Sequence, residues 1–230
     1  MKSSGKLSGD ERREAIIRAV RRVFAERGFH GTTTRALAEA AGVSEALLFK
    51  HFPNKEALYS AMQAFCSAER DPERLERVKA LEPSTSTLVL IVHMMVARIV
   101  RRECTGSEDP SIQHRLMLRS MMEDGEFARL FFQRSISCWL TKVQECLEAA
   151  VATGEAIRGP VLPNLGAIFT FHLAKTIMLS LIPATPVVDY GVDCEPLIEQ
   201  AVWFSLRGMG VKDEAIRRYY NPEALAILGG

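Results

Sequence analysis

Residues 33–59 contain the pattern that most restricts what this chain can fold into. A short run with apolar residues at helical spacing follows Thr33 and is interrupted by Gly42. A second short run begins at Ser44 and stops at Pro53. Ser and Thr cap helix starts, and Gly adopts the left-handed conformation at helix ends, so the pattern predicts helix, tight turn and helix. This arrangement is typical of a helix-turn-helix, whose second helix enters the major groove of DNA.

The charge distribution agrees with that interpretation. Residues 1–60 hold 11 Lys and Arg against 7 Asp and Glu, whereas residues 61–230 hold 18 against 21. A basic excess on the segment with the helix-turn-helix pattern is what attraction to phosphate requires. The excess is modest, so it supports the helix-turn-helix interpretation but would not indicate DNA binding by itself.

The remaining pattern predicts an all-α fold. A capping box at Ser8 and Glu11 predicts a helix from Gly9 to Arg27, and Asn54 caps a helix that runs to about Arg70. Further helices are expected at 84–103, 111–123, 126–153, 164–182, 195–209 and 212–220. We expect a helix-turn-helix domain over 1–60, with its fourth helix continuing to about 70 as a connector, and a larger helical domain over 71–230. The link between them is expected near residues 68–84.

Two apolar stretches were considered as membrane spans. Leu88–Ala97 is too short, and Leu165–Pro183 contains His172 and Lys175, so we expect neither to meet the criterion for a spanning helix. The N-terminus shows no apolar run of the kind found in secretory signals. These features favour a cytoplasmic protein.

The five cysteines give a second argument about compartment. Their number is odd and no Cys-x-x-Cys spacing occurs, which favours reduced thiols in a cytosolic protein. Packing in apolar helices is the simpler interpretation, and redox sensing is the alternative.

The recognition helix supplies the candidate DNA contacts. The outward positions on 44–51 are expected to be Glu45, Ala46, Leu47, Lys50 and His51. Lys50 suits a base or a phosphate, and the small Ala46 lets the helix sit deep in the groove. Leu47 suits a thymine methyl group, and Glu45 either accepts a hydrogen bond from cytosine or stays solvated.

Two further candidates lie where helices begin. Thr33 and Lys55 stand at expected helix N-termini, where free amides and the positive dipole end favour phosphate.

A longer series of residues gives the pattern its specificity. It reads Ala25-x-x-Gly28-Phe29-x-x-Thr32-Thr33, then Leu37-Ala38-x-x-Ala41-Gly42-Val43-Ser44, then Leu48-Phe49-x-His51-Phe52-Pro53-Asn54-Lys55-Glu56-Ala57-Leu58. With this series, residues 9–59 resemble the DNA-binding domain of the TetR family of transcriptional regulators. The resemblance implies a dimeric all-helical regulator whose operator binding changes when a small molecule binds the C-terminal domain.

The resemblance also implies a set of DNA-facing residues. By position they are Thr33, Ser44, Ala46, Phe49, Lys50, His51 and Lys55. The family often has tyrosine where Phe49 stands, with its hydroxyl on a phosphate. Phe49 cannot make that hydrogen bond, so it is expected to pack against the sugar-phosphate wall.

The C-terminal domain is rich in methionine and aromatic residues, which suit an adaptable apolar cavity. By resemblance, the pocket would lie between the helices at 84–103, 111–123, 126–153 and 164–182. The candidate ligand-binding residues are Met94, Met117, Met121, Phe131, Trp139, Phe169 and His172. The expected effector is lipophilic, aromatic or acyl-bearing. The alternative is an ordinary packed core with no ligand.

Neither a metal nor a cofactor is expected. The chain has no His-x-x-x-His or Cys-His spacing of the zinc type, no Gly-rich phosphate loop and no Gly-x-Ser-x-Gly elbow. We therefore do not expect an enzyme.

The resulting hypothesis is a ligand-responsive repressor. It would bind a palindromic operator as a homodimer, through the helices at about 164–182 and 195–209, and would be released by a lipophilic small molecule. The alternative is a DNA-binding regulator or activator without a small ligand, controlled by a protein partner.

Overall fold

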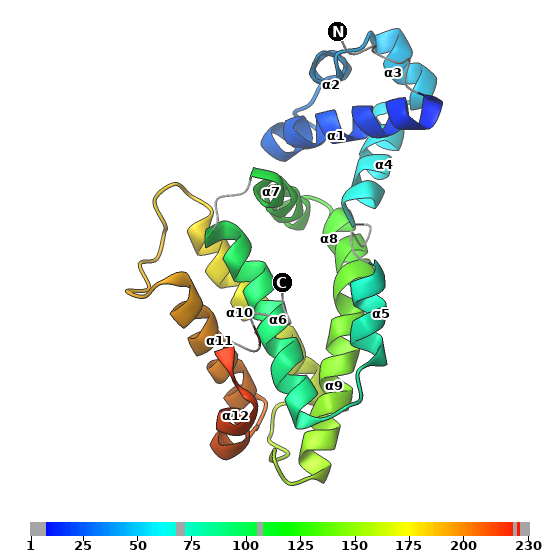
Figure 1. Ribbon diagram of the computed structural model, residues 1–230. Coiled ribbons are helices and arrows are strands. Elements are labelled where there is room, and N and C mark those ends of the chain that lie inside the picture. The colour runs from blue at the N-terminus through cyan, green and yellow to red at the C-terminus, as the bar shows by residue number, and fades with distance from the viewer. Residues whose placement is uncertain (1–7, 68–71, 105–107, 223–224, 226–230) are drawn as a thin grey trace, which may run out of the picture. The chain divides into compact units, whose positions relative to one another are not determined.

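The computed structural model describes residues 8–67, 72–104, 108–222 and 225, and within them the fold is all-helical, as predicted (Figure 1). The first helices are α1 (Gly9–Arg27), α2 (Thr34–Ala41), α3 (Glu45–His51), α4 (Lys55–Ser67), α5 (Pro72–Ala80) and α6 (Thr85–Cys104). They are followed by α7 (Glu108–Met122), α8 (Glu126–Phe131), the π-helix η1 (Phe132–Ile136), α9 (Ser137–Ala152), α10 (Pro163–Leu181), α11 (Cys194–Gly208) and α12 (Asp213–Tyr219).

The N-terminal helices begin and end where the sequence signals predict. Ser8 and Glu11 form the capping box of α1: the Glu11 amide donates to the Ser8 hydroxyl, and the Ser8 amide donates to the Glu11 carboxylate. Asn54 caps α4 by accepting from the Ala57 amide at 2.8 Å. Local capping chemistry is therefore sufficient to fix these boundaries.

Two elements were not predicted. The segment expected as a link, residues 68–84, contains α5, which packs against α9 through the buried Val78 and carries a Lys79–Glu76 ion pair at 2.7 Å. The single helix expected at 126–153 is divided by η1. Helix α5 was not predicted because its residues are mostly charged. The π-helix η1 was not predicted because one wider turn hardly changes the spacing of apolar residues.

The chain divides into two compact units that do not follow chain order. The first unit combines residues 1–69 with 108–135, and the second combines 70–107 with 136–230. Residues 108–135 were expected in the C-terminal domain, yet they cluster with the N-terminal helices. The division predicted from the sequence, with a first domain over 1–60 and a second over 71–230, keeps each domain continuous in the chain and remains a prediction.

The first unit is built around a single apolar core. Its fully buried members from the N-terminal helices include Phe24, Leu37, Leu48, Phe52 and Leu58. Leu116 of α7 and Phe127 of α8 belong to the same core, because α7 packs on α1 and α8 packs on α4. The helix-turn-helix therefore rests on helices that lie far away in the sequence.

The second unit is organised around α6. Residues 91–97 of this helix are all buried, because α9, α10, α11 and α12 each pack against it. A helix that is apolar on all sides belongs at the centre of a bundle.

Helix α10 has a mixed environment. By length and composition it is apolar enough to cross a membrane, so the expectation that it fails this criterion was wrong. In this structure, 39% of its most apolar window is buried by the rest of the protein. Core helices pass the same test, and α10 packs on α6, α9 and α11.

The thiols also differ from expectation. Cys66, Cys138 and Cys146 are free, but Cys194 is disulfide-bonded. The prediction of reduced thiols was therefore wrong for Cys194, which is the first residue of α11.

Candidate nucleic-acid interface

The turn between α2 and α3 sets the angle of the recognition helix. Gly42 has φ 63° and ψ 32°, the left-handed conformation that glycine adopts without a Cβ penalty. Its amide donates to the carbonyls of Ala38 and Glu39, and the Val43 amide donates to Ala38 at 3.0 Å. These bonds end α2 and hold Val43 against the core.

Helix α3 has one buried and one exposed side. Ser44 caps it by accepting from the Leu47 amide at 3.2 Å, and Leu48 is buried. Of the predicted DNA contacts, the exposed ones are Thr33, Ser44, Glu45, Ala46, Phe49 and Lys50. Leu47, His51 and Lys55 are half-buried. The short helix thus presents a continuous outer surface while one leucine anchors it below.

Phe49 is an unusual surface residue on this helix. Its side chain is 41% exposed, although a large aromatic group is usually buried. Because the ring carries no hydroxyl, it can contribute apolar contact and no hydrogen bond.

Lys55 makes internal contacts that were not predicted from the sequence. Its ammonium group donates to the carbonyls of Phe29 and Thr32, each at 2.9 Å, and lies 4.3 Å from the centre of the Phe29 ring. The side chain therefore fixes the loop before α2. The backbone amides at the start of α4 remain the local groups suited to phosphate.

Two contacts that orient α3 were not predicted from the sequence. The Thr34 hydroxyl donates to the Glu45 carboxylate at 2.8 Å and so ties α2 to α3. Arg13 of α1 donates to the His51 carbonyl at 2.6 Å and lies 4.2 Å from the centre of the Phe52 ring. The positive charge at this end of α3 complements the helix dipole. Thr34 and Glu45 are 11 residues apart and Arg13 and His51 are 38 apart, so no local spacing announces either pair.

The predicted ligand-binding residues are distributed over both units. In the first unit, Met117 and Phe131 are half-buried and Met121 is exposed. In the second unit, Met94 and Trp139 are buried. Phe169 and His172 are exposed on α10, which does not suit the lining of an internal cavity.

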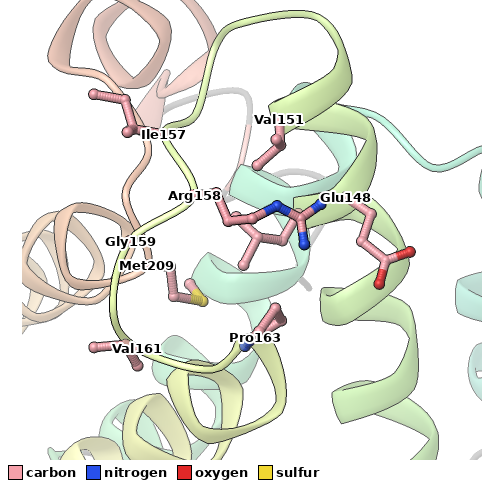
Figure 2. A pocket seen from close by; sticks show the side chains of 9 residues that line it. Glu148, Val151, Ile157, Arg158, Gly159, Val161, Pro163 and Met209 are labelled. Atoms are coloured by element: carbon pink, nitrogen blue, oxygen red, sulfur yellow. The ribbon is translucent and has the colours of Figure 1, made fainter.

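One hollow of the second unit lies elsewhere. It is lined by Leu147, Glu148, Val151, Ile157, Arg158, Gly159, Val161, Pro163 and Met209. Figure 2 shows Arg158 extending from the loop toward α9, which carries Glu148. The hollow leaves about 20 Å³ free, which is room for about one water molecule. None of the predicted ligand residues lines it.

Comparison with known proteins identifies the helix-turn-helix. Residues 16–62 match the family described as bacterial regulatory proteins, tetR family. The helix-turn-helix of this chain is therefore similar to the DNA-binding domain of the TetR family. This match agrees with the predicted role in transcription regulation.

Individual relatives match over part of their length. The transcriptional repressor AcnR of Corynebacterium diphtheriae is 31% identical over 129 residues, which are 52% of this chain and 63% of that protein. The regulatory protein RaaS of Mycobacterium tuberculosis is 32% identical over 142 residues, which are 62% of this chain and 56% of that protein. The chain therefore covers less than two thirds of either relative.

Solved structures of other proteins share the fold over most of the chain. AibR in complex with isovaleryl coenzyme A and operator DNA has a TM-score of 0.59 at 21% identity, over 84% of this chain and 97% of AibR. FadR from Bacillus subtilis in complex with stearoyl-CoA has a TM-score of 0.58 at 19% identity, over 85% and 98%. At these identities the likeness concerns the fold alone.

Proposed function

We propose that this protein is a ligand-responsive transcriptional repressor that binds a palindromic operator as a homodimer and is released by a lipophilic small molecule. The exposed outer side of α3, capped by Ser44 and carrying Lys50, is the observation that carries the proposal. A helix of this kind fits the major groove, where its first residues meet base edges. We place this activity in the cytoplasm, where the operator would be.

The outer residues of α3 divide the work of recognition. Lys50 supplies charge for a phosphate or guanine, and Ala46 allows close approach. Glu45, held by Thr34, points an oriented acceptor at the groove, where the cytosine amino group is its natural partner. Phe49 packs against the backbone wall.

The second unit offers a surface for a second copy. Phe169 of α10 is 54% exposed and Phe204 of α11 is 71% exposed, although both are large aromatic residues. Exposed apolar groups on neighbouring helices are a common mark of a subunit interface. We propose that these helices form the dimer, because a two-fold dimer presents two recognition helices to a palindrome. In this proposal Phe169 and His172 belong to the dimer face and not to the effector pocket.

The effector is proposed to act through α7 and α8. These helices share the core of the helix-turn-helix, so a ligand that displaces them changes the support of α1 and α4 directly. Met117, Met121 and Phe131 on these helices, and Met94 and Trp139 in the second unit, remain the proposed ligand residues. Two proteins of similar fold hold acyl-coenzyme A molecules, which supports a lipophilic, acyl-bearing effector.

A second candidate is a DNA-binding regulator that responds to a protein partner. The observation in its favour concerns one hollow among the described residues: the hollow beside Glu148 and Met209 has room for about one water molecule and not for an acyl-coenzyme A. Under this candidate, no acyl-coenzyme A would change operator affinity.

The test begins with an operator selected from a random double-stranded DNA library by the full-length chain. Lys50→Ala should reduce operator affinity at least tenfold and lower the salt dependence by about one counterion per half-site. Lys212→Ala, which removes an exposed lysine of the second unit, is the matched control and should change neither quantity.

The effector is tested with the same operator by fluorescence anisotropy. Stearoyl-CoA should weaken operator binding, and free coenzyme A should not. If Lys50→Ala binds as the parent does, then α3 is not the reading element. If stearoyl-CoA and shorter acyl-CoA esters have no effect, the partner-controlled candidate is favoured.

A further inference from the structure

Helix α3 is held at each end by a side chain from another helix. At its start, the Thr34 hydroxyl of α2 donates to the Glu45 carboxylate at 2.8 Å. At its end, the Arg13 guanidinium of α1 donates to the His51 carbonyl at 2.6 Å. Of the seven residues of α3, Leu48 is the buried one, and a helix of this length is not stable on its own. The placement of α3 therefore depends in part on these two outside contacts.

The contact at the start of α3 orders a side chain that reads bases. Thr34 and Glu45 are the first residues of α2 and α3. A threonine hydroxyl has one hydrogen to donate, and here it goes to Oε2 of Glu45. Glu45 is exposed, and its carboxylate has further acceptor sites. Because a glutamate side chain otherwise turns through many rotamers, ordering it before DNA arrives removes part of the entropy cost of the contact.

A fixed carboxylate is selective for the base edge that it meets in the major groove. It accepts from the amino groups of cytosine and adenine, and it repels the acceptors of guanine and thymine. Adenine presents its amino group beside the acceptor N7, whereas cytosine presents its amino group without an acceptor on the same base. A fixed Glu45 therefore prefers cytosine, and a mobile Glu45 tolerates more partners.

The contact at the end of α3 fixes the helix as a whole. The last carbonyls of a helix have no partner within it, and Arg13 supplies one for His51. The same guanidinium lies 4.2 Å from the centre of the ring of Phe52, which is buried. Because Arg13 belongs to α1, this contact sets where the end of α3, which carries Lys50, lies against α1.

We propose that Thr34 and Arg13 are positioning residues for DNA recognition and that they have separate effects. Thr34 orders Glu45, so it determines the base preference at one position of each half-site. Arg13 places all of α3, so it determines affinity for every operator sequence alike. Neither residue acts by neutralising a phosphate. This proposal rests on the proposed function.

The role of Thr34 is tested by fluorescence anisotropy at 20 °C on the selected operator and its single-base-pair variants. The parent should prefer cytosine about tenfold at one position of each half-site. Thr34→Val keeps the shape of the side chain without the hydroxyl, so it should reduce that preference to about twofold and leave the other positions unchanged. Thr34→Ser should restore the preference. The matched control Thr141→Val removes an exposed hydroxyl of the second unit and should change no preference.

A further variant identifies the position that Glu45 faces. Glu45→Gln should alter the preference at the same position as Thr34→Val, because glutamine pairs with N6 and N7 of adenine. The role of Thr34 is overturned if Thr34→Val keeps the parent's preferences or loses affinity equally at all positions. It is also overturned if Glu45→Gln changes the preference at no position.

The role of Arg13 is tested by affinity and its salt dependence together. Arg13→Gln should weaken binding about fivefold to the operator and to each variant, with the slope of log Kd against log salt unchanged. A phosphate contact would instead lower that slope by about one counterion per half-site, as Lys50→Ala should. Arg13→Lys still has a donor for the His51 carbonyl and should restore most of the affinity. Arg158→Gln, which removes an exposed arginine of the second unit, is the matched control.

Three results would contradict the role of Arg13: unchanged affinity, a lower salt slope, or a loss confined to one base position. Circular dichroism establishes that each variant is folded at 20 °C. If Arg13→Gln loses helical content, Arg13→Met takes its place, because it keeps an apolar stem over the Phe52 ring.

Hydrogen exchange separates this proposal from the proposed function. If the full-length chain selects no operator, the proposed function fails, and the base preference set by Thr34 fails with it. The contact of Arg13 is then decided by the backbone amides of α3, which should exchange about fivefold faster in Arg13→Gln than in the parent. Equal exchange rates would overturn the placement of α3 by Arg13.

Discussion

Lys55 provides a sharp test of stability, because the structure gives its ammonium group several internal contacts. Its ammonium group donates to the Phe29 and Thr32 carbonyls and lies over the Phe29 ring. Lys55→Met keeps the length and apolar stem of the side chain but removes both hydrogen bonds and the charge. The loop before α2 would then lose the group that holds it to the start of α4.

The expected loss follows from these contacts. A hydrogen bond from a charged donor contributes about 1.5–3 kcal/mol, and a cation over an aromatic ring contributes about 0.5–1 kcal/mol at an exposed site. Lys55 is half-buried, so water can replace part of both interactions. We therefore expect a loss of about 2 kcal/mol. For a chain of this size, that corresponds to a fall in Tm of about 4–8 °C.

The assay is thermal unfolding of the full-length chain followed by circular dichroism. Lys50→Met is the matched control, because Lys50 is exposed on α3 and its loss should change stability by less than about 0.5 kcal/mol. The two variants should behave in opposite ways in operator binding at 20 °C, where Lys50→Met should be the weaker binder. A Tm for Lys55→Met within 1 °C of the parent would refute the reasoning.

Three further predictions follow from single residues. Gly42→Ala should destabilise the chain by about 1–2 kcal/mol in urea unfolding through backbone strain alone, because a Cβ there meets no atom within 4 Å; an unchanged midpoint would contradict the role of φ 63°. Burial lowers the pKa of His93, so the folded state favours the neutral ring, and the stability this contributes is present above about pH 6.5 and lost as the pH falls toward the lowered value. His93→Gln should therefore flatten the fall of Tm between pH 7.5 and 5.5, whereas the exposed control His30→Gln should leave it as it is, and equal slopes in all three proteins would count against this account. Phe204→Glu should weaken the proposed dimer at least tenfold in sedimentation velocity, and an unchanged sedimentation coefficient at all concentrations would remove α11 from the interface.

The sequence could predict those parts of the fold that depend on neighbouring residues. The capping box at Ser8, the cap at Ser44 and the turn at Gly42 are local, and the structure has them where the pattern places them. Helix α5 was missed because its charged residues conceal the buried Val78. The interruption at η1 was missed because one wide turn hardly changes the apolar spacing.

In the candidate DNA-binding site, too, the features that depend on neighbouring residues could be predicted, and those that depend on the packing of helices could not. The exposure of Glu45, Ala46 and Lys50 follows from helical periodicity, so it could be predicted. The contact between Thr34 and Glu45 depends on how two helices are packed, which no spacing encodes. The effector residues were chosen by composition, and composition does not specify which side of a helix faces inward. Phe169 and His172 on α10 were chosen in this way, and both are exposed.

The shared core of the first unit has a consequence for how the protein is made. Leu116 and Phe127 belong to the apolar core that α1 and α4 share. The core of the helix-turn-helix is therefore complete only after the ribosome has synthesised roughly 130 residues. In a fragment that ends after α4, the core residues that α7 and α8 cover would be exposed to water. The exposed residues of α3 are free of this packing constraint, so they can change without disturbing the core. The buried faces of α1 and α4, by contrast, have to change together with those of α7 and α8.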